Sequence, residues 1–375
     1  MTNGVSLYVH VPFCERKCAY CGFYSEPVAS HDVEALVDAL LAELNRYELQ
    51  DPIRTVYVGG GSPTCLGLKH LMRLIEALAA AAPDAEEFTV EANPGQVNPD
   101  LLAALRTAGV NRLSIGVQSF TESEVRFLGR GHNVHDTKKT IEDTRAAGFE
   151  NINLDLIFAI PGSTMSSWKK TLAAALAHDV EHISAYALTL ESGTALQAAV
   201  AVGEIVSIDE ETDRQMYEIA IDTLTQSGYH HYEISNFAKP GFECRHNLRY
   251  WANEPFIGLG PSAASFYRGR RTTNIADIRA YVDGINTGTP MLVDVQVPGE
   301  IQIACETAVL NLRRTEGIDR RQFKERTGYD VMDLFVNEIE THRRAGMLEV
   351  TEDYIRLKRQ AYAVADRVLC DFSTV

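Results

Sequence analysis

The stretch Cys14-Glu-Arg-Lys-Cys18-Ala-Tyr-Cys21 follows closely on an apolar, β-branched run, Leu7 to Val11, that predicts a β-strand. Three thiols in one short loop can converge on an inorganic centre. A structural zinc site closes with four ligands in C-x₂₋₄-C pairs, and no second pair follows here. A [4Fe–4S] cluster normally takes four thiolates, so three leave one iron open to another ligand. The spacing therefore favours an open iron–sulfur cluster, with zinc or three buried structural cysteines as the alternatives.

The composition is that of a folded globular chain. Of 375 residues, 45% are apolar and 23% are charged, which excludes disordered, collagen-like and disulfide-scaffold proteins. Lys+Arg 35 against Asp+Glu 51 gives a net charge of −16. Such a field repels phosphate backbones, so we expect no nucleic-acid partner. The seven cysteines cannot all pair with one another, and we expect reduced thiols that are free to act as ligands.

The amino terminus, MTNGVSLYVHVPFC, has neither a basic flank nor a small-residue cleavage site and predicts no signal peptide. The most apolar helical run begins at Leu71, is interrupted by Arg73 and Glu76, and is shorter than the roughly 20 residues that span a bilayer. We therefore expect a cytoplasmic protein without a transmembrane segment. Peripheral membrane docking and the oligomeric state stay open.

Apolar runs alternate with helix-period stretches through the first half of the chain, which predicts six β/α units around a parallel sheet. Function in such sheets lies at the carboxyl ends of the strands. The predicted strands are 7–11, 55–59, 88–92, 112–117, 152–159 and 182–188. The predicted helices are 32–49, 68–82, 100–108, a pair within 121–147, 165–177 and 209–228.

The second half of the chain does not continue the alternation of strands and helices. We expect residues 1–235 to form the barrel with the cofactor site and 236–298 to form an irregular linker that covers it. Residues 299–375 predict a smaller domain of short helices and a hairpin, which resembles a winged helix. Its segment Arg313–Arg326 holds six basic and three acidic residues. We interpret this segment as a solvated face rather than a nucleic-acid site, because it forms no dense basic stripe.

A glycine stretch, Gly59-Gly60-Gly61-Ser62, follows the second predicted strand. Alone, three glycines are more often a tight turn. Together with C-x₃-C-x₂-C after the first strand, they resemble the radical SAM superfamily. That resemblance implies an α/β fold with a partial (β/α)₆ barrel, a [4Fe–4S] cluster and S-adenosylmethionine (SAM). It also implies that SAM chelates the open iron and is split by one electron into methionine and a 5′-deoxyadenosyl radical.

Further motifs narrow the resemblance to the branch related to oxygen-independent coproporphyrinogen III oxidase, an enzyme of porphyrin biosynthesis. They are Leu7–Cys14, Gly59–Thr64, Val90–Pro94, Gly116–Phe120, Leu128–Arg130 and Asn153–Ile157, in the same order along the chain. The resemblance implies that the three cysteines bind the cluster. It implies SAM contacts at Tyr8, Tyr20, Gly60, Gly61, Ser62, Glu91, Gln118, Arg130, Asp155 and Ala187.

Two features separate the chain from the oxidases of that branch. Those oxidases carry a fourth cysteine two residues after the third, and this chain has Phe23 at that position. The oxidases also carry a longer amino-terminal extension. Both departures count against decarboxylase activity. The segment His246-Asn247-Leu248-Arg249-Tyr250-Trp251 instead resembles the HNxxYW motif of the HemW family of heme chaperones.

The HemW resemblance implies heme binding and transfer to acceptor hemoproteins, including those of respiratory chains, with His246, Asn247, Tyr250 and Trp251 at the heme. From the residues alone, a histidine can ligate heme iron and flanking aromatics can contact a porphyrin, although such a histidine is more often a core residue. An anaerobic coproporphyrinogen III dehydrogenase is the second hypothesis. Other possible iron ligands are His230, His231 and Cys244.

Overall fold

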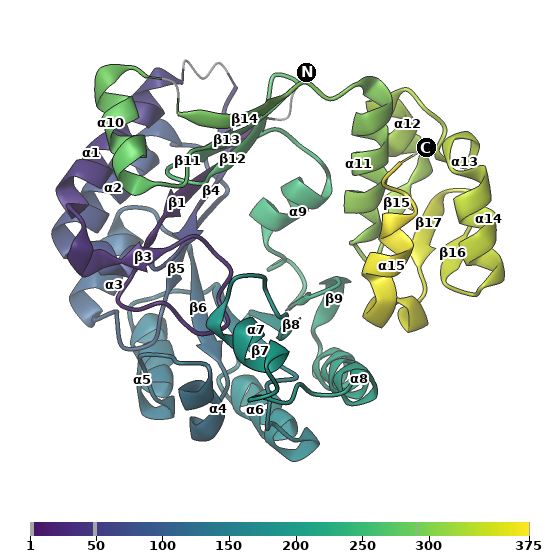
Figure 1. The fold of residues 1–375 in the computed structure, drawn as a ribbon, viewed down its shortest axis with the longest axis horizontal. Helices are drawn as coiled ribbons and strands as arrows, with labels where there is room; N and C mark the ends of the chain where they lie inside the picture. Colours follow the sequence, from purple (N-terminus) through teal and green to yellow (C-terminus); the bar gives the residue numbers. More distant parts are fainter. Residues whose placement is uncertain (1–3, 48–50, 290, 375) are drawn as a thin grey trace.

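The largest part of the protein is one open twelve-stranded sheet (Figure 1). The computed structural model describes residues 4–47, 51–289 and 291–374. The sheet runs in the order β14-β13-β12-β11-β1-β4-β5-β6-β7-β8-β10-β9, so its two edges do not meet and the barrel is incomplete, as predicted. Six neighbouring parallel strands match the predicted ones: β1 (Val5–Val11), β4 (Ile53–Gly60), β5 (Glu87–Ala92), β6 (Arg112–Gln118), β7 (Ile152–Phe158) and β8 (His182–Ala187).

Helices connect these strands and cover the outer face of the sheet. Several begin at a side chain that caps the first turn, such as Asp32, Asn98 and Thr164. The first helix ends at Arg46, and its predicted end at Leu49 lies outside the described residues. The helices are α1 (Val33–Arg46), α2 (Gly67–Ala81), α3 (Pro99–Thr107), α4 (Glu122–Phe127), α5 (Val134–Ala146), α6 (Met165–Ala177), α7 (Ala195–Ala201) and α8 (Glu210–Gln226).

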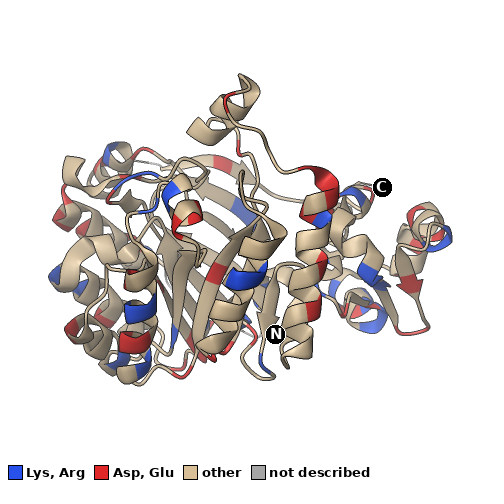
Figure 2. Ribbon diagram, turned by 90° about the horizontal axis from the view of Figure 1, so that it is seen from below, with Lys and Arg blue, Asp and Glu red and all other residues tan. Residues whose placement is uncertain are grey.

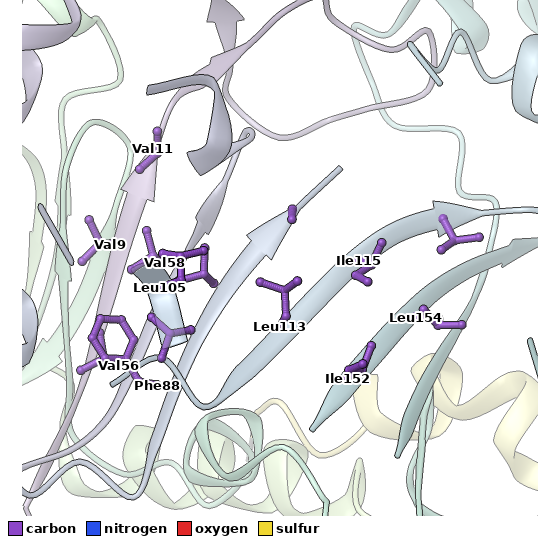
Figure 3. Close-up of a cluster of buried hydrophobic side chains, with 14 of the residues drawn as sticks. Val9, Val11, Val56, Val58, Phe88, Leu105, Leu113, Ile115, Ile152 and Leu154 are labelled. Atoms are coloured by element: carbon purple, nitrogen blue, oxygen red, sulfur yellow. The ribbon is translucent and has the colours of Figure 1, made fainter. Parts of the chain in front are cut away.

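The two faces of the parallel strands differ in chemistry, because successive side chains of a strand point to opposite faces. Figure 3 shows the outward set as one apolar cluster. Its members on the central strands are Val56, Val58, Phe88, Val90, Leu113, Ile115, Leu154 and Leu156. The residues between them face the barrel interior and are mostly polar: Thr55, Tyr57, Glu87, Glu91, Arg112, Ser114, Asn153 and Asp155. The barrel is thus packed on its outside and polar on its inside.

Residues 236–298, predicted to be irregular, contain regular structure. Strand β11 (Phe256–Leu259) pairs in parallel with β1, and an antiparallel meander extends the sheet beyond it. The prediction of an irregular cover was wrong here, because these short strands are held by pairing with a strand about 250 residues earlier in the chain. The remaining elements are β9 (His230–Glu233), β10 (Asn236–Ala238), α9 (Arg245–Trp251), β12 (Ala264–Tyr267), β13 (Arg270–Asn274), α10 (Ile278–Thr287) and β14 (Leu292–Gln296).

The carboxyl-terminal part has a hydrophobic cluster of its own, which includes Leu312, Phe323 and Phe372. Both charge signs are interspersed on its helices (Figure 2), as in the pair Arg321–Glu325. No helix of the described chain is long and apolar enough to cross a bilayer. The elements are α11 (Glu300–Leu312), β15 (Ile318–Asp319), α12 (Arg320–Thr327), α13 (Val331–Leu334), α14 (Val336–Arg344), the hairpin β16 (Leu348–Val350) and β17 (Tyr354–Leu357), and α15 (Ala365–Cys370).

Candidate cofactor site

A cavity of about 700 Å³ opens at the carboxyl ends of the parallel strands. Most residues predicted for the cluster and for SAM line it, although they come from many separate elements. Tyr8 is not in its wall, and its hydroxyl instead lies 2.9 Å from Nδ1 of His10. The predicted residues that line the cavity are Cys14, Cys18, Cys21, Tyr20, Gly60, Gly61, Ser62, Glu91, Gln118, Arg130, Asp155 and Ala187.

Cys14 ends β2 (Phe13–Cys14), and Cys18 and Cys21 lie on the loop between it and β3 (Glu26–Pro27). All are half-buried and free of disulfides. Burial raises the pKa of the Cys14 thiol to about 11, so this thiol is protonated at neutral pH until a metal ligand displaces its proton. No three His, Cys, Asp or Glu side chains within the described ranges converge on a point for a single metal ion.

The packing at the end of β4 also requires glycine at positions 60 and 61. Gly60 has φ +106°, and a Cβ there would lie 2.4 Å from Nδ1 of His10. A Cβ on Gly61 would lie 2.5 Å from the carbonyl oxygen of Phe13, on the strand that leads into the cysteine loop. The glycines therefore let the second β/α turn pack against the cysteine loop. This packing role comes in addition to the SAM contacts that the resemblance implies for Gly60 and Gly61.

Two half-buried carboxylates, Glu91 and Asp155, face the cavity. Glu91 accepts hydrogen bonds from the Tyr57 hydroxyl at 2.7 Å and the Gly60 N–H at 3.1 Å, yet burial raises its pKa to about 7. Asp155 accepts from Ser114 Oγ at 3.1 Å and Asn153 Nδ2 at 2.9 Å, and burial raises its pKa as well. Neither carboxylate has a cation within salt-bridge distance among the described residues. The cavity therefore suits a ligand that brings positive charge or several hydroxyl donors.

The guanidinium of Arg130 lies on the other side of the cavity. Its Nη1 is 3.8 Å from Sγ of Cys18, and its Nη2 donates to the Gly116 carbonyl oxygen at 2.8 Å and to Asn93. A half-buried guanidinium beside a cysteine that is predicted to bind the cluster can bind a ligand carboxylate. Gln118 ends β6 with φ +67°, and this left-handed backbone at a strand end places it in the cavity wall.

The predicted heme residues lie elsewhere, on α9, which packs below the cavity against β4 and against α11 of the carboxyl-terminal part. His246 is 1% exposed, and its ring centroid is 5.2 Å from that of Tyr57 and 4.8 Å from that of Tyr250. Trp251 faces the other way, with the guanidinium of Arg313 4.9 Å over its ring. The helix thus joins the barrel to the carboxyl-terminal part.

The other possible iron ligands are dispersed. Cys244 precedes α9, is fully buried, and donates its thiol hydrogen to Glu87 Oε1 at 3.4 Å. His231 stacks on Phe237 in the core, with ring centroids 4.3 Å apart. His230 is exposed near Glu243, with 3.4 Å between Nδ1 and Oε1.

Four interior residues near α9 were not among the predicted site residues, and one of them, Tyr57, also lines the cavity. Tyr57 contacts both Glu91 and His246, and Glu87 accepts the backbone N–H groups of Arg245 at 2.9 Å and His246 at 3.0 Å. Arg112 and His182 are buried beside them. The signal was present in the sequence, since polar residues occur at every second position of the predicted strands.

Comparison with known proteins agrees with this architecture. The sequence profile of the radical SAM superfamily matches residues 8–175, and that of the HemN C-terminal domain matches 300–364. The heme chaperone HemW of Bacillus subtilis is 36% identical over 98% of both chains, and that of Lactococcus lactis is 35% identical over 89% of this chain and 88% of its own.

Among solved structures, coproporphyrinogen III oxidase (HemN) of Escherichia coli superposes with a TM-score of 0.86 at 23% identity. It covers 100% of this chain and 91% of its own, which shows a shared fold. The identity to the HemW proteins over nearly the full chain shows the family. This chain belongs to the HemW family of the radical SAM superfamily.

Proposed function

We propose that this protein is a cytoplasmic heme chaperone that binds heme through α9 and passes it to acceptor hemoproteins. Relatives that share about a third of its residues over nearly the full chain are named heme chaperones. The observation in the structure that carries the proposal is the state of the His246 imidazole.

The hydrogen-bond network assigns the tautomer of His246. The Thr55 hydroxyl donates to Ser6 Oγ at 3.0 Å, so its oxygen is the acceptor in the 2.9 Å contact with His246 Nδ1. Nδ1 therefore carries the hydrogen. Burial lowers the pKa of His246 to about 3, so the ring is neutral and Nε2 has a free lone pair. Nε2 is buried without a hydrogen-bond partner among the described residues.

A neutral imidazole held at Nδ1 with a bare Nε2 is how proteins present histidine to a metal. An unpartnered buried nitrogen otherwise costs free energy, so its retention supports a ligand role. Because His246 is almost fully buried, iron reaches Nε2 only when part of its surroundings moves away. Tyr250 and Trp251 would then offer aromatic area to the porphyrin, with Asn247 between them and His246 on the same short helix.

Membership of the radical SAM superfamily implies a [4Fe–4S] cluster and SAM in the main cavity. Cys14, Cys18 and Cys21 would hold the cluster, and Arg130 would bind the SAM carboxylate. The amino group and the ribose hydroxyls would donate to the carboxylates of Glu91 and Asp155. When bound together, cluster and SAM supply one-electron cleavage of the sulfonium. The protein's own part is to exclude water and to hold these polar groups in place.

An oxygen-independent coproporphyrinogen III dehydrogenase is the second candidate, since the HemN fold extends over the whole chain. Phe23 argues against it, because this side chain takes the place of the oxidase cysteine and lines the mouth of the cavity while 69% exposed. An aromatic ring at that position offers contact area but no thiol chemistry.

One experiment separates the two functions. Anaerobically reconstituted protein is titrated with hemin and, in parallel, is supplied with coproporphyrinogen III, SAM and a reductant. We expect a saturable Soret change at one heme per chain and no decarboxylation above background. Conversion of the porphyrinogen at a catalytic rate would establish the dehydrogenase instead. A chain that binds no heme would refute the chaperone.

A further inference from the structure

Tyr57 touches both candidate sites. Its hydroxyl donates to Glu91 Oε1 at 2.7 Å, and its ring lies against the His246 imidazole at a centroid distance of 5.2 Å. It also lines the main cavity. The Tyr57 side chain therefore lies between Glu91, the proposed SAM contact, and His246, the proposed iron ligand.

The same strand that carries Glu91 also holds α9 in place. Glu87, on β5, accepts hydrogen bonds from the thiol of Cys244 at 3.4 Å and from the first two N–H groups of α9. Glu87 and Glu91 are four residues apart on one face of β5, which corresponds to roughly 13 Å. The residue that anchors α9, Glu87, and the proposed SAM contact, Glu91, thus lie on the same strand.

The imidazole of His246 contacts Thr55 at Nδ1 and packs against the rings of Tyr57, at an interplanar angle of 36°, and Tyr250, at 81°. Because His246 is 1% exposed, a porphyrin reaches Nε2 only if a neighbouring side chain moves, and the ring of Tyr57 is one that packs against the imidazole. Tyr57 can withdraw only if it gives up its hydrogen bond to Glu91. A SAM molecule that donates to Glu91 fixes that carboxylate and makes the bond to Tyr57 harder to lose.

We infer that Tyr57 is a positioning residue through which SAM and heme oppose each other's binding. The inference rests on the proposed function, because it takes α9 as the heme site and Glu91 as a SAM contact. Linkage requires the effect to be reciprocal: SAM weakens heme binding by the same factor by which heme weakens SAM binding.

A second route could carry such a coupling. Asp155 accepts from Asn153, whose Oδ1 lies 2.6 Å from His182 Nδ1. His182 Nε2 lies 2.8 Å from the Tyr232 hydroxyl. That hydroxyl accepts a hydrogen bond at 3.2 Å from the backbone N–H of Cys244, the residue before α9. This series of hydrogen bonds is longer and does not contact the ring of His246. We therefore assign the coupling to Tyr57 and use Tyr232→Phe to test the alternative.

The test measures the hemin dissociation constant with and without saturating SAM, on reconstituted protein without reductant so that SAM stays intact. We expect SAM to raise the constant about tenfold, the effect of one net hydrogen bond. Tyr57→Phe should bind both ligands with a ratio near one. Tyr232→Phe should keep the wild-type ratio. Tyr229→Phe, which removes a buried hydroxyl that donates to Val180 O, is the matched control and should also keep it.

General destabilisation would weaken both titrations and leave their ratio unchanged, so the ratio reports the coupling. A wild-type ratio of one would overturn the inference while the proposed function stands. An unchanged ratio in Tyr57→Phe, or its loss in Tyr232→Phe, would move the coupling to the other route and overturn the role of Tyr57. Absence of heme binding in the wild type would instead remove the proposed function, and the coupling with it.

Discussion

Glu91→Gln tests whether the cavity keeps a destabilising carboxylate for the sake of its ligand. Burial raises the pKa of Glu91 from its ordinary value of 4.5 to about 7. Because the folded pKa lies above the unfolded one, the stabilising contribution is complete below pH 4.5 and is lost as the pH rises to 7. That difference corresponds to about 3 kcal/mol of folding free energy. A glutamine avoids this loss.

The amide has one acceptor oxygen, so either the Tyr57 hydroxyl or the Gly60 N–H loses its partner, at a cost of about 1 kcal/mol. We therefore expect ligand-free Glu91→Gln to be about 2 kcal/mol more stable than wild type at pH 8 and no more stable at pH 4. SAM should bind roughly 10- to 100-fold more weakly, because a hydrogen bond to a charged group is lost. Denaturant unfolding at the two pH values and calorimetric SAM titration measure these effects.

Glu233→Gln is the control for this experiment. Burial also raises the pKa of Glu233 to about 7, but this residue lies on β9 and outside the cavity wall. It should show a similar gain in stability at pH 8 and unchanged SAM affinity. If Glu91→Gln is less stable than wild type at pH 8, the buried ionised carboxylate does not lower the stability of the wild type. If it binds SAM as tightly as wild type, Glu91 does not contact SAM.

Replacing Cys14, Cys18 and Cys21 together by Ala should remove the roughly four iron and four sulfide per chain that reconstitution of the wild type gives; iron retention by the triple variant would place the cluster elsewhere. His246→Ala should shift the Soret band and weaken heme binding, because it removes an iron bond; an unchanged spectrum and affinity would assign the iron to another ligand. Trp251→Ala should weaken heme binding less, by about 1 kcal/mol of lost aromatic contact in a hemin titration, and a larger loss than that of His246→Ala would reverse their roles.

The parallel strands were predictable because their own residues determine them. The predicted run 152–159 became Ile152–Phe158, and 112–117 became Arg112–Gln118. β-branched and apolar residues at alternate positions pack against the helices whatever lies elsewhere in the chain. The edge strands were missed for the opposite reason. Phe256–Leu259 is flanked by turn residues and is a strand only because β1 lies beside it, which no local pattern reveals.

Sequence motifs predicted which residues belong to the site, but the contacts between those residues could not be predicted. Sequence motifs indicated Glu91 and His246 separately, and nothing in their spacing of 155 residues indicates that one tyrosine touches both. The depth of burial of His246 was equally hidden, because it depends on how α9 sits between β4 and α11. A short helix with aromatic residues can face solvent or core with the same sequence.

The polar interior of the barrel is itself an argument for ligand binding. Closed (β/α)₈ barrels fill their interior with branched apolar side chains. Here the inward positions include Glu91, Asp155 and Arg112, and burial opposes the charge of each one. A fold that keeps such groups gives up stability in the ligand-free state, and a ligand that satisfies them restores it by mass action. Loading SAM should therefore stabilise the barrel most where it is most polar, along β5 to β7, and hydrogen exchange would detect this as protection of those strands rather than of the edge meander β11 to β14.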